Sequence, residues 1–157
     1  MDSALVSELG GGWLATSSIR VLVVDDYQPI RQFLSSRLQN TSGVYVCWEA
    51  SDGLEAVQKA EELQPDVILL DIRLPKLNGI EVARRIVKVS PGSKMIFVSQ
   101  ESSTYAVQEA LDTGARGYVV KIDARRELLV CVNAVLRGER FVGQRFSDHD
   151  FASHEGA

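Results

Sequence analysis

The stretch VLVVDDYQP, residues 21–29, places four apolar residues directly before two adjacent aspartates and a proline. A run that is apolar without alternation is typical of a strand covered on both faces, as in a parallel sheet. Pro29 stands where a helix can begin, because its missing N–H would have no partner in the first helical turn. The stretch therefore predicts a buried strand, a loop with two like charges, and a helix.

Four more apolar runs follow, and helical patterns separate them. Ile30, Phe33, Leu34 and Leu38, for example, share one face of a helix. Strand and helix thus alternate between about residues 19 and 137, which predicts an open α/β sheet with right-handed crossovers. The predicted strands are IRVLVV (19–24), VYVCW (44–48), DVILL (66–70), KMIFV (94–98) and GYVV (117–120).

Short polar signals mark the ends of these helices. Asp52 and Asn78 each stand three positions before a glutamate, which is the spacing of a capping box. Gly114 follows an apolar stripe at 106–111 and is a suitable C-terminal cap. Asp123 precedes the stripe of the last helix and is its predicted start.

The amino-acid composition is typical of a globular protein. The chain has 157 residues, 45% of them hydrophobic and 24% charged, with a net charge of -4. Such a charge gives no general attraction to nucleic acid or to an anionic membrane. No apolar run approaches the roughly 18 residues of a spanning helix, and the N-terminus lacks the basic region of a secretory signal. We therefore expect a cytoplasmic protein.

The chain divides into three expected parts. These are a flexible arm at 1–18, one domain at 19–137 and a polar tail at 138–157. The tail carries Phe141, Phe146 and Phe151 at intervals that fit no helix face, and these side chains are candidates to fold back onto the domain.

We expect neither the cysteines nor the histidines to take part in catalysis, metal binding or a disulfide. Cys47 and Cys131 lie inside apolar runs without CxxC spacing, so we expect two buried thiols rather than a metal site or a disulfide. His149 and His154 fall in the polar tail, where we expect solvated side chains and no catalytic base.

Reactive side chains follow four of the five runs. Asp25 and Asp26 follow the first run, Asp71 follows the third, Ser99 the fourth and Lys121 the fifth. The carboxyl ends of parallel strands share one edge, where ligands bind. Three carboxylates there repel one another unless a cation accompanies them, and their hard oxygens suit Mg²⁺. The hydroxyl and the ammonium would then bind the oxygens of a phosphoryl group that Asp71 accepts as a nucleophile.

The blocks VLVVDD, VILLDIRLPKLNG, MIFVS and GARGYVVK, in this order, resemble the signature blocks of the response-regulator receiver domain of two-component signalling. The resemblance covers about residues 19–137. It implies a flavodoxin-like (CheY-like), doubly wound sheet of five parallel strands in the order 2-1-3-4-5, with helices on both faces.

The resemblance also implies roles for individual residues, a cofactor and partners. We expect a regulatory phosphoacceptor that catalyses only its own phosphorylation and dephosphorylation, with a sensor histidine kinase or a phosphotransfer protein as donor. The implied roles fall on Asp71 as phosphoacceptor, on Asp25, Asp26, Asp71 and the backbone carbonyl of Arg73 as Mg²⁺ ligands, on Ser99 and Tyr118 as switch residues, and on Lys121 as the essential lysine.

Phosphorylation would transmit the signal by changing the surface that a partner binds. The fourth helix (stripe 106–111), the fifth strand (117–120) and the fifth helix (stripe 128–135) would present Tyr105 and Tyr118 to an unidentified partner or to a second copy in a homodimer. GARGYVVK looks most like NarL/FixJ-type receivers, whose usual output is a DNA-binding helix-turn-helix domain. Too few residues follow the last helix for such a domain. We therefore expect a stand-alone receiver without direct nucleic-acid binding. The alternative is a receiver fragment of a longer DNA-binding regulator.

Two other readings are weaker. A phosphohydrolase of the haloacid dehalogenase type needs a second acid two residues after a nucleophile on the first strand, where this chain has Tyr27. A degenerate receiver acting as a constitutive interaction module is at odds with the intact set of acids.

Ile122 stands where the family often has a proline preceded by a cis peptide bond. We expect a trans bond here, because a cis bond before a residue other than proline costs about 2.5 to 4 kcal/mol.

One pair of side chains is a candidate gate. Arg73 lies two residues after Asp71, and Glu101 lies two after Ser99, on loops that follow neighbouring strands of the implied sheet. We expect their side chains to meet across the mouth of the site. With Gln100 beside them, they would shield the acyl phosphate from water.

Overall fold

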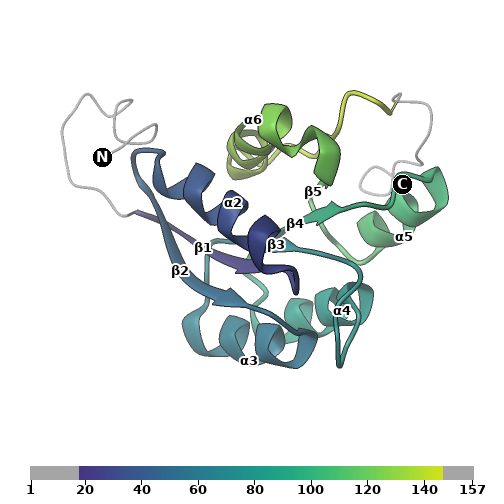
Figure 1. Cartoon of the computed structure of the whole chain (residues 1–157). Helices are drawn as coiled ribbons and strands as arrows, with labels where there is room; N and C mark the ends of the chain where they lie inside the picture. Colours follow the sequence, from purple (N-terminus) through teal and green to yellow (C-terminus); the bar gives the residue numbers. More distant parts are fainter. Residues whose placement is uncertain (1–17, 147–157) are drawn as a thin grey trace.

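The computed structural model describes residues 18–146, in which strands and helices alternate along the chain (Figure 1). Each apolar run of the sequence forms one of the first five strands. The strands are β1 (Ile19–Val24), β2 (Val44–Ala50), β3 (Val67–Leu70), β4 (Lys94–Ser99), β5 (Gly117–Val120) and β6 (Phe141–Val142). The helices are α2 (Gln28–Gln39), α3 (Gly53–Leu63), α4 (Gly79–Val89), α5 (Thr104–Asp112), α6 (Ala124–Leu136) and a 3₁₀ turn, η1 (Lys121–Asp123).

The strands form one parallel sheet in the order β2-β1-β3-β4-β5-β6. The predicted order of the first five strands is confirmed, but the predicted count is one short. In β6, Phe141 pairs with Gly117 and Val142 with Tyr118 of β5. A strand of this length gives no readable period in the sequence, which is why the apolar runs did not predict it.

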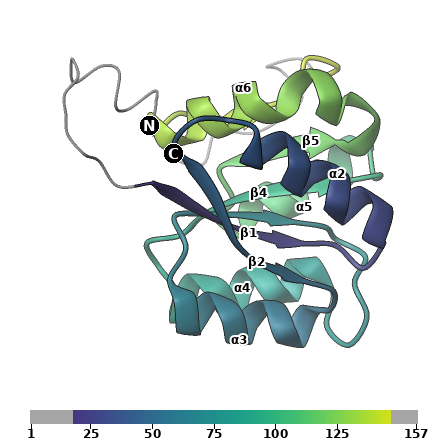
Figure 2. The same cartoon turned by 60° about the vertical axis from the view of Figure 1, so that its left-hand side comes forward.

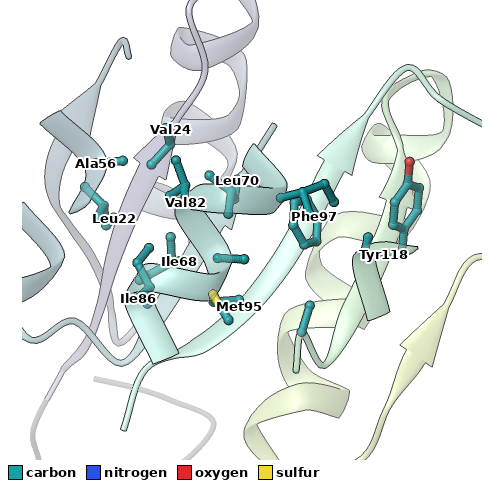
Figure 3. Close-up of a cluster of buried hydrophobic side chains, with 14 of the residues drawn as sticks. Leu22, Val24, Ala56, Ile68, Leu70, Val82, Ile86, Met95, Phe97 and Tyr118 are labelled. Carbon is teal, nitrogen blue, oxygen red and sulfur yellow. The ribbon is translucent and has the colours of Figure 1, made fainter. Parts of the chain in front are cut away.

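Helices cover both faces of the sheet. Figures 1 and 2 show α2 and α6 on one side and α3 and α4 on the other. Because successive side chains of a strand point to opposite faces, one apolar run contributes side chains to two hydrophobic cores, one on each face of the sheet. Val21 and Val23 pack in the core beneath α2 and α6. Leu22 and Val24 pack in the opposite core with Ala56 and side chains of α4, drawn in Figure 3.

The prediction that every strand is covered on both faces is wrong for β2. This strand lies at the edge of the sheet, and its Tyr45 and Trp48 are exposed. Cys47 is therefore only half-buried, whereas Cys131 is buried as predicted. Trp48 is held by α3, because Lys59 Nζ lies 3.9 Å from its ring centroid.

The predicted caps of α3 and α4 are present. Asp52 Oδ1 accepts the backbone N–H of Glu55 at 2.8 Å, and Asn78 Oδ1 accepts two N–H groups of the first turn of α4. Gly114 follows α5 with a φ of 105°, as a C-terminal cap requires. Asp123 does precede α6, but its carboxylate pairs with side chains of α6 and of the segment beyond it instead of capping the helix.

Several expectations fall outside the described residues. These are the character of the arm up to residue 17, the packing of Phe151 and the role of His149 and His154. Phe141 and Phe146 do lie against the hydrophobic cores. The described backbone has no cis peptide bond, so the bond before Ile122 is trans as expected. No helix within residues 18–146 is long and apolar enough to cross a bilayer.

Candidate functional site

The carboxyl ends of β1, β3, β4 and β5 meet at one edge of the sheet. Asp71 continues the ladder past β3, because its backbone N–H donates to Val24 O at 3.1 Å. Ser99 at the end of β4 pairs with Val120 of β5, directly before Lys121. Parallel pairing in this register brings together side chains that lie far apart in the sequence.

Three carboxylates converge at this edge. Asp25, Asp26 and Asp71 each offer an oxygen, and these oxygens all lie within 4.8 Å of one another. Asp25 and Asp71 are only 1% and 5% exposed, whereas Asp26 is exposed. The site is therefore buried at its floor and open at one side.

Lys121 lies between the two buried carboxylates. Its Nζ lies 2.8 Å from Asp25 Oδ2 and donates a hydrogen bond of 2.9 Å to Asp71 Oδ2. Burial by itself would lower the pKa of Lys121, but the contacts with Asp25 and Asp71 outweigh it and the pKa is raised. The ammonium is therefore firmly charged at neutral pH.

The acids remain under-neutralised. Burial, reinforced by the neighbouring Asp25, raises the pKa of Asp71 even though Lys121 opposes the shift. Asp25 Oδ2 is buried, and its partner among the described residues is the ammonium of Lys121, with which it forms an ion pair. One ammonium faces three carboxyl groups, and a divalent cation would balance the remaining negative charge. This donor set fits Mg²⁺, which prefers carboxylate oxygens.

The loop after β3 is held by the start of α4. The backbone N–H of Gly79 donates to Ile72 O at 2.7 Å, and a Cβ at position 79 would lie 2.0 Å from Asp71 O. Only glycine permits this approach. The N-terminus of α4 therefore sets the position of Asp71.

Ser99 and Tyr118 are linked through the backbone of Glu101. Ser99 Oγ accepts the N–H of Glu101 at 3.1 Å, and Tyr118 Oη donates to Glu101 O at 2.7 Å. Both side chains are buried, and burial raises the pKa of Tyr118 to about 12. The hydroxyl of Tyr118 is therefore a neutral donor at physiological pH.

In this structure, where Asp71 is unmodified, Tyr118 does not reach the surface. Tyr118 is 0% exposed and packs in the core of Figure 3, stacked on Phe97 and met edge-on by Phe146. Tyr105, in contrast, is 77% exposed. The covering residue, Phe146, lies in the C-terminal segment, and its packing agrees with the expectation that the phenylalanines there fold back onto the domain.

The pair expected at the mouth is in contact. Arg73 Nε donates to Glu101 Oε2 at 2.8 Å, and Gln100 is exposed beside Glu101 in the sequence.

The sequence patterns did not identify Arg31, whose Nη1 donates to the carbonyl oxygen of Asp25 at 2.8 Å. Arg31 carries no separate signal, because a polar residue in the first turn of a helix is unremarkable in a sequence.

Residues 21–133 match the family model of the response regulator receiver domain. Among curated proteins, the response regulator GacA of Pseudomonas viridiflava is 32% identical over 129 residues, covering 82% of this chain and 60% of that protein. The response regulator protein VraR of Staphylococcus aureus is 34% identical over 122 residues, covering 78% of this chain and 58% of VraR. The chain thus spans about three fifths of the length of these relatives.

Solved structures agree with the family match. A two-component response regulator of the LuxR family from Aurantimonas has a TM-score of 0.78 and 29% identity, over 82% of this chain and 92% of that one. The signal receiver domain of the putative response regulator NarL from Mycobacterium tuberculosis has a TM-score of 0.75 and 30% identity, over 79% of this chain and 100% of that one. The phosphohydrolase alternative is not favoured. The chain belongs to the response regulator receiver domain family, a regulatory family of two-component systems.

Proposed function

We propose that this receiver accepts a phosphoryl group on Asp71 in a Mg²⁺-dependent reaction and thereby changes its surface. The observation that carries the proposal is the position of Asp71, buried beside two other carboxylates and in contact with Lys121. A buried carboxylate with this environment is a poor structural element and a well-placed nucleophile.

The proposed step is an in-line displacement. An oxygen of Asp71 forms a bond to the phosphorus of the donor, while the bond from phosphorus to the donor's nitrogen or oxygen breaks and its electron pair stays with the leaving group. Mg²⁺ held by the three aspartates and the backbone carbonyl of Arg73 would neutralise charge on the transferred oxygens. Lys121, already beside Asp71, would follow the charge onto the phosphoryl group.

The switch would begin at Ser99. Its hydroxyl would turn toward the phosphoryl oxygens, and Glu101 and Tyr118 would readjust because they are linked to Ser99 by hydrogen bonds. The changed surface would lie over α5, β5 and α6. We propose an output partner or a second copy of this chain as its ligand, with no direct binding to nucleic acid.

The proposed donor is a sensor histidine kinase or a phosphotransfer protein, because the curated relatives are response regulators. The protein would act in the cytoplasm, where such donors present their phosphohistidine. It would catalyse only its own phosphorylation and dephosphorylation.

The test is labelling by a small phosphodonor. Incubation with acetyl phosphate and Mg²⁺ should add one phosphoryl group, and peptide mass spectrometry should place it on Asp71. Asp71→Asn or chelation of the metal should abolish it. Asp66→Asn is the matched control, because Asp66 lies at the opposite end of the same strand, where it accepts the N–H of Arg20. Labelling that survives both the substitution at 71 and chelation would overturn the proposal, and a degenerate receiver would not be labelled at all.

A further inference from the structure

The chain closes the outer edge of β5 with its own C-terminal strap, which we define as residues 138–146. The strap follows α6 and is the yellow-green segment beside α6 and β5 in Figure 1. Phe141 N donates to Arg116 O at 2.9 Å, and Gly143 N donates to Tyr118 O at 3.2 Å. An edge that would otherwise be open to another chain is thereby paired.

Two buried carboxylates hold the strap in place. Arg145 Nε donates to Asp123 Oδ2 at 2.7 Å, and Gln144 N donates to Glu127 Oε2 at 3.0 Å. A Cβ at Gly143 would lie 2.6 Å from Glu127 Oε1, so the backbone of the strap lies directly against this carboxylate. Hydrogen bonds to charged carboxylates, such as these two to Asp123 and Glu127, are stronger than neutral ones and indicate that the strap packs in one specific position.

The first connection between the strap and the site runs through Tyr118. The ring of Phe146 meets the ring of Tyr118 edge-on, with centroids 6.4 Å apart. Tyr118 Oη is bonded to the carbonyl of Glu101, whose N–H is bonded to Ser99. A movement at Ser99 therefore reaches the seat of Phe146 through three contacts.

The second connection runs through η1. Lys121, which contacts Asp25 and Asp71, and Asp123, which anchors Arg145, belong to the same short turn. Arg145 also lines a pocket of ≈ 500 Å³ together with Lys121, Ile122, Gln100 and Ser102. The strap therefore borders a pocket that Lys121 of the site also lines.

We propose that the C-terminal strap is a latch that is seated while Asp71 is unmodified and released when Asp71 is phosphorylated. The inference rests on the proposed function, since phosphorylation would draw Ser99 and Lys121 toward the phosphoryl oxygens and so disturb both connections. Release would expose the edge of β5 and the ring of Tyr118. The face proposed for a second copy is thus covered by the chain itself until the signal arrives.

The first experiment measures amide exchange by NMR in the full chain, before and after addition of Mg²⁺ and beryllofluoride, a mimic of the phosphoryl group. The amides of Phe141, Gly143 and Gln144 should exchange at least about tenfold faster with the mimic. The amide of Leu69 in the central strand β3 should not change.

The second experiment uses reciprocity: if the mimic favours the released strap, loosening the strap must favour the mimic. Arg145→Ala should therefore bind Mg²⁺-beryllofluoride about fivefold more tightly by calorimetry and speed exchange at Gly143 without it. Arg126→Ala is the matched control, because Arg126 also pairs with Asp123, at 3.0 Å, but belongs to α6 and does not tether the strap. Phe146→Ala tests the connection through Tyr118 and should act in the same direction as Arg145→Ala.

The outcomes separate the two proposals. If acetyl phosphate labels Asp71 while the strap amides keep their original exchange rates, the latch is wrong and the receiver function stands. Equal affinities of Arg145→Ala and Arg126→Ala for the mimic would also overturn the latch. If Asp71 is not labelled at all, the proposed function fails and the latch falls with it.

Discussion

Asp71 illustrates how a functional residue opposes the stability of its own fold. Its carboxylate is buried beside Asp25, and its raised pKa shows that burial and repulsion outweigh the contact with Lys121. A buried charge with incomplete compensation is costly. The site thus holds a reactive group whose negative charge is relieved only by a cation.

We predict that Asp71→Asn stabilises the metal-free protein by about 1 kcal/mol at neutral pH, because a neutral amide of the same shape removes the cost of burying charge. The folded-state pKa of Asp71 is raised, so this cost is absent below its ordinary value of 3.8, appears as the pH rises, and is complete above the raised value. Urea unfolding in EDTA, from pH 7 down to about pH 3.5, should show the difference shrinking. Equal stability at pH 7 would contradict the prediction.

The ion pair of Arg73 and Glu101 can affect the lifetime of the acyl phosphate even though it adds little stability. As a stabilising contact, an exposed pair contributes only about 0 to 1 kcal/mol. Excluding the attacking water by about 1.4 kcal/mol, however, slows hydrolysis of the acyl phosphate tenfold. Arg73→Ala and Glu101→Ala should each speed the loss of the phosphoryl group, and the double variant should show less than the product of the two effects.

The measurement is the decay of labelled protein after removal of the donor. Lys76→Ala is the control, since Lys76 lies on the same loop but pairs with Asp52, at 3.4 Å. Its decay rate should match the parent protein. Unchanged rates in all the variants at 73 and 101 would show that the pair has no gating role.

At the scale of elements, the start of α4 positions the chemistry. Asn78 caps the helix, and Gly79 lets the helix approach the backbone of Asp71. We predict that Gly79→Ala moves Asp71, lowers stability by about 1 to 3 kcal/mol through overpacking, and strongly reduces labelling. Gly92→Ala is the control, because a Cβ there meets nothing within 4 Å.

Thermal unfolding and labelling of both variants check the prediction. A Gly79→Ala protein that is labelled at the parent rate would show that α4 does not set the position of Asp71. Gly92→Ala should behave as the parent protein in both measurements.

In the whole molecule, parallel pairing places the carboxyl ends of strands that are remote in the sequence at one edge of the sheet. Every proposed site residue lies between Asp25 and Lys121. We therefore predict that deleting residues 1–18 leaves the rate of Asp71 labelling unchanged. A loss of more than about tenfold in a deletion variant that keeps its circular dichroism spectrum would show a role for the arm.

Residue patterns predicted the alternation of strands and helices and the residues at the strand ends, and the family resemblance implied the order of the first five strands. Apolar runs and capping residues are local signals, because burial and backbone hydrogen bonding act on neighbouring residues. These signals sufficed to predict that Asp25, Asp26, Asp71, Ser99 and Lys121 share one edge, and the structure brings their elements together there.

The exposure of each strand and the packing of residues 138–146 became clear from the three-dimensional structure alone. The runs of β1 and β2 look alike in sequence, yet β2 is an edge strand and leaves Trp48 exposed. The strap is too short and too polar for a period to reveal it, and it is held by carboxylates on another element, Asp123 and Glu127. Contacts of this kind depend on distances between remote residues, and those distances exist only once the sheet has formed.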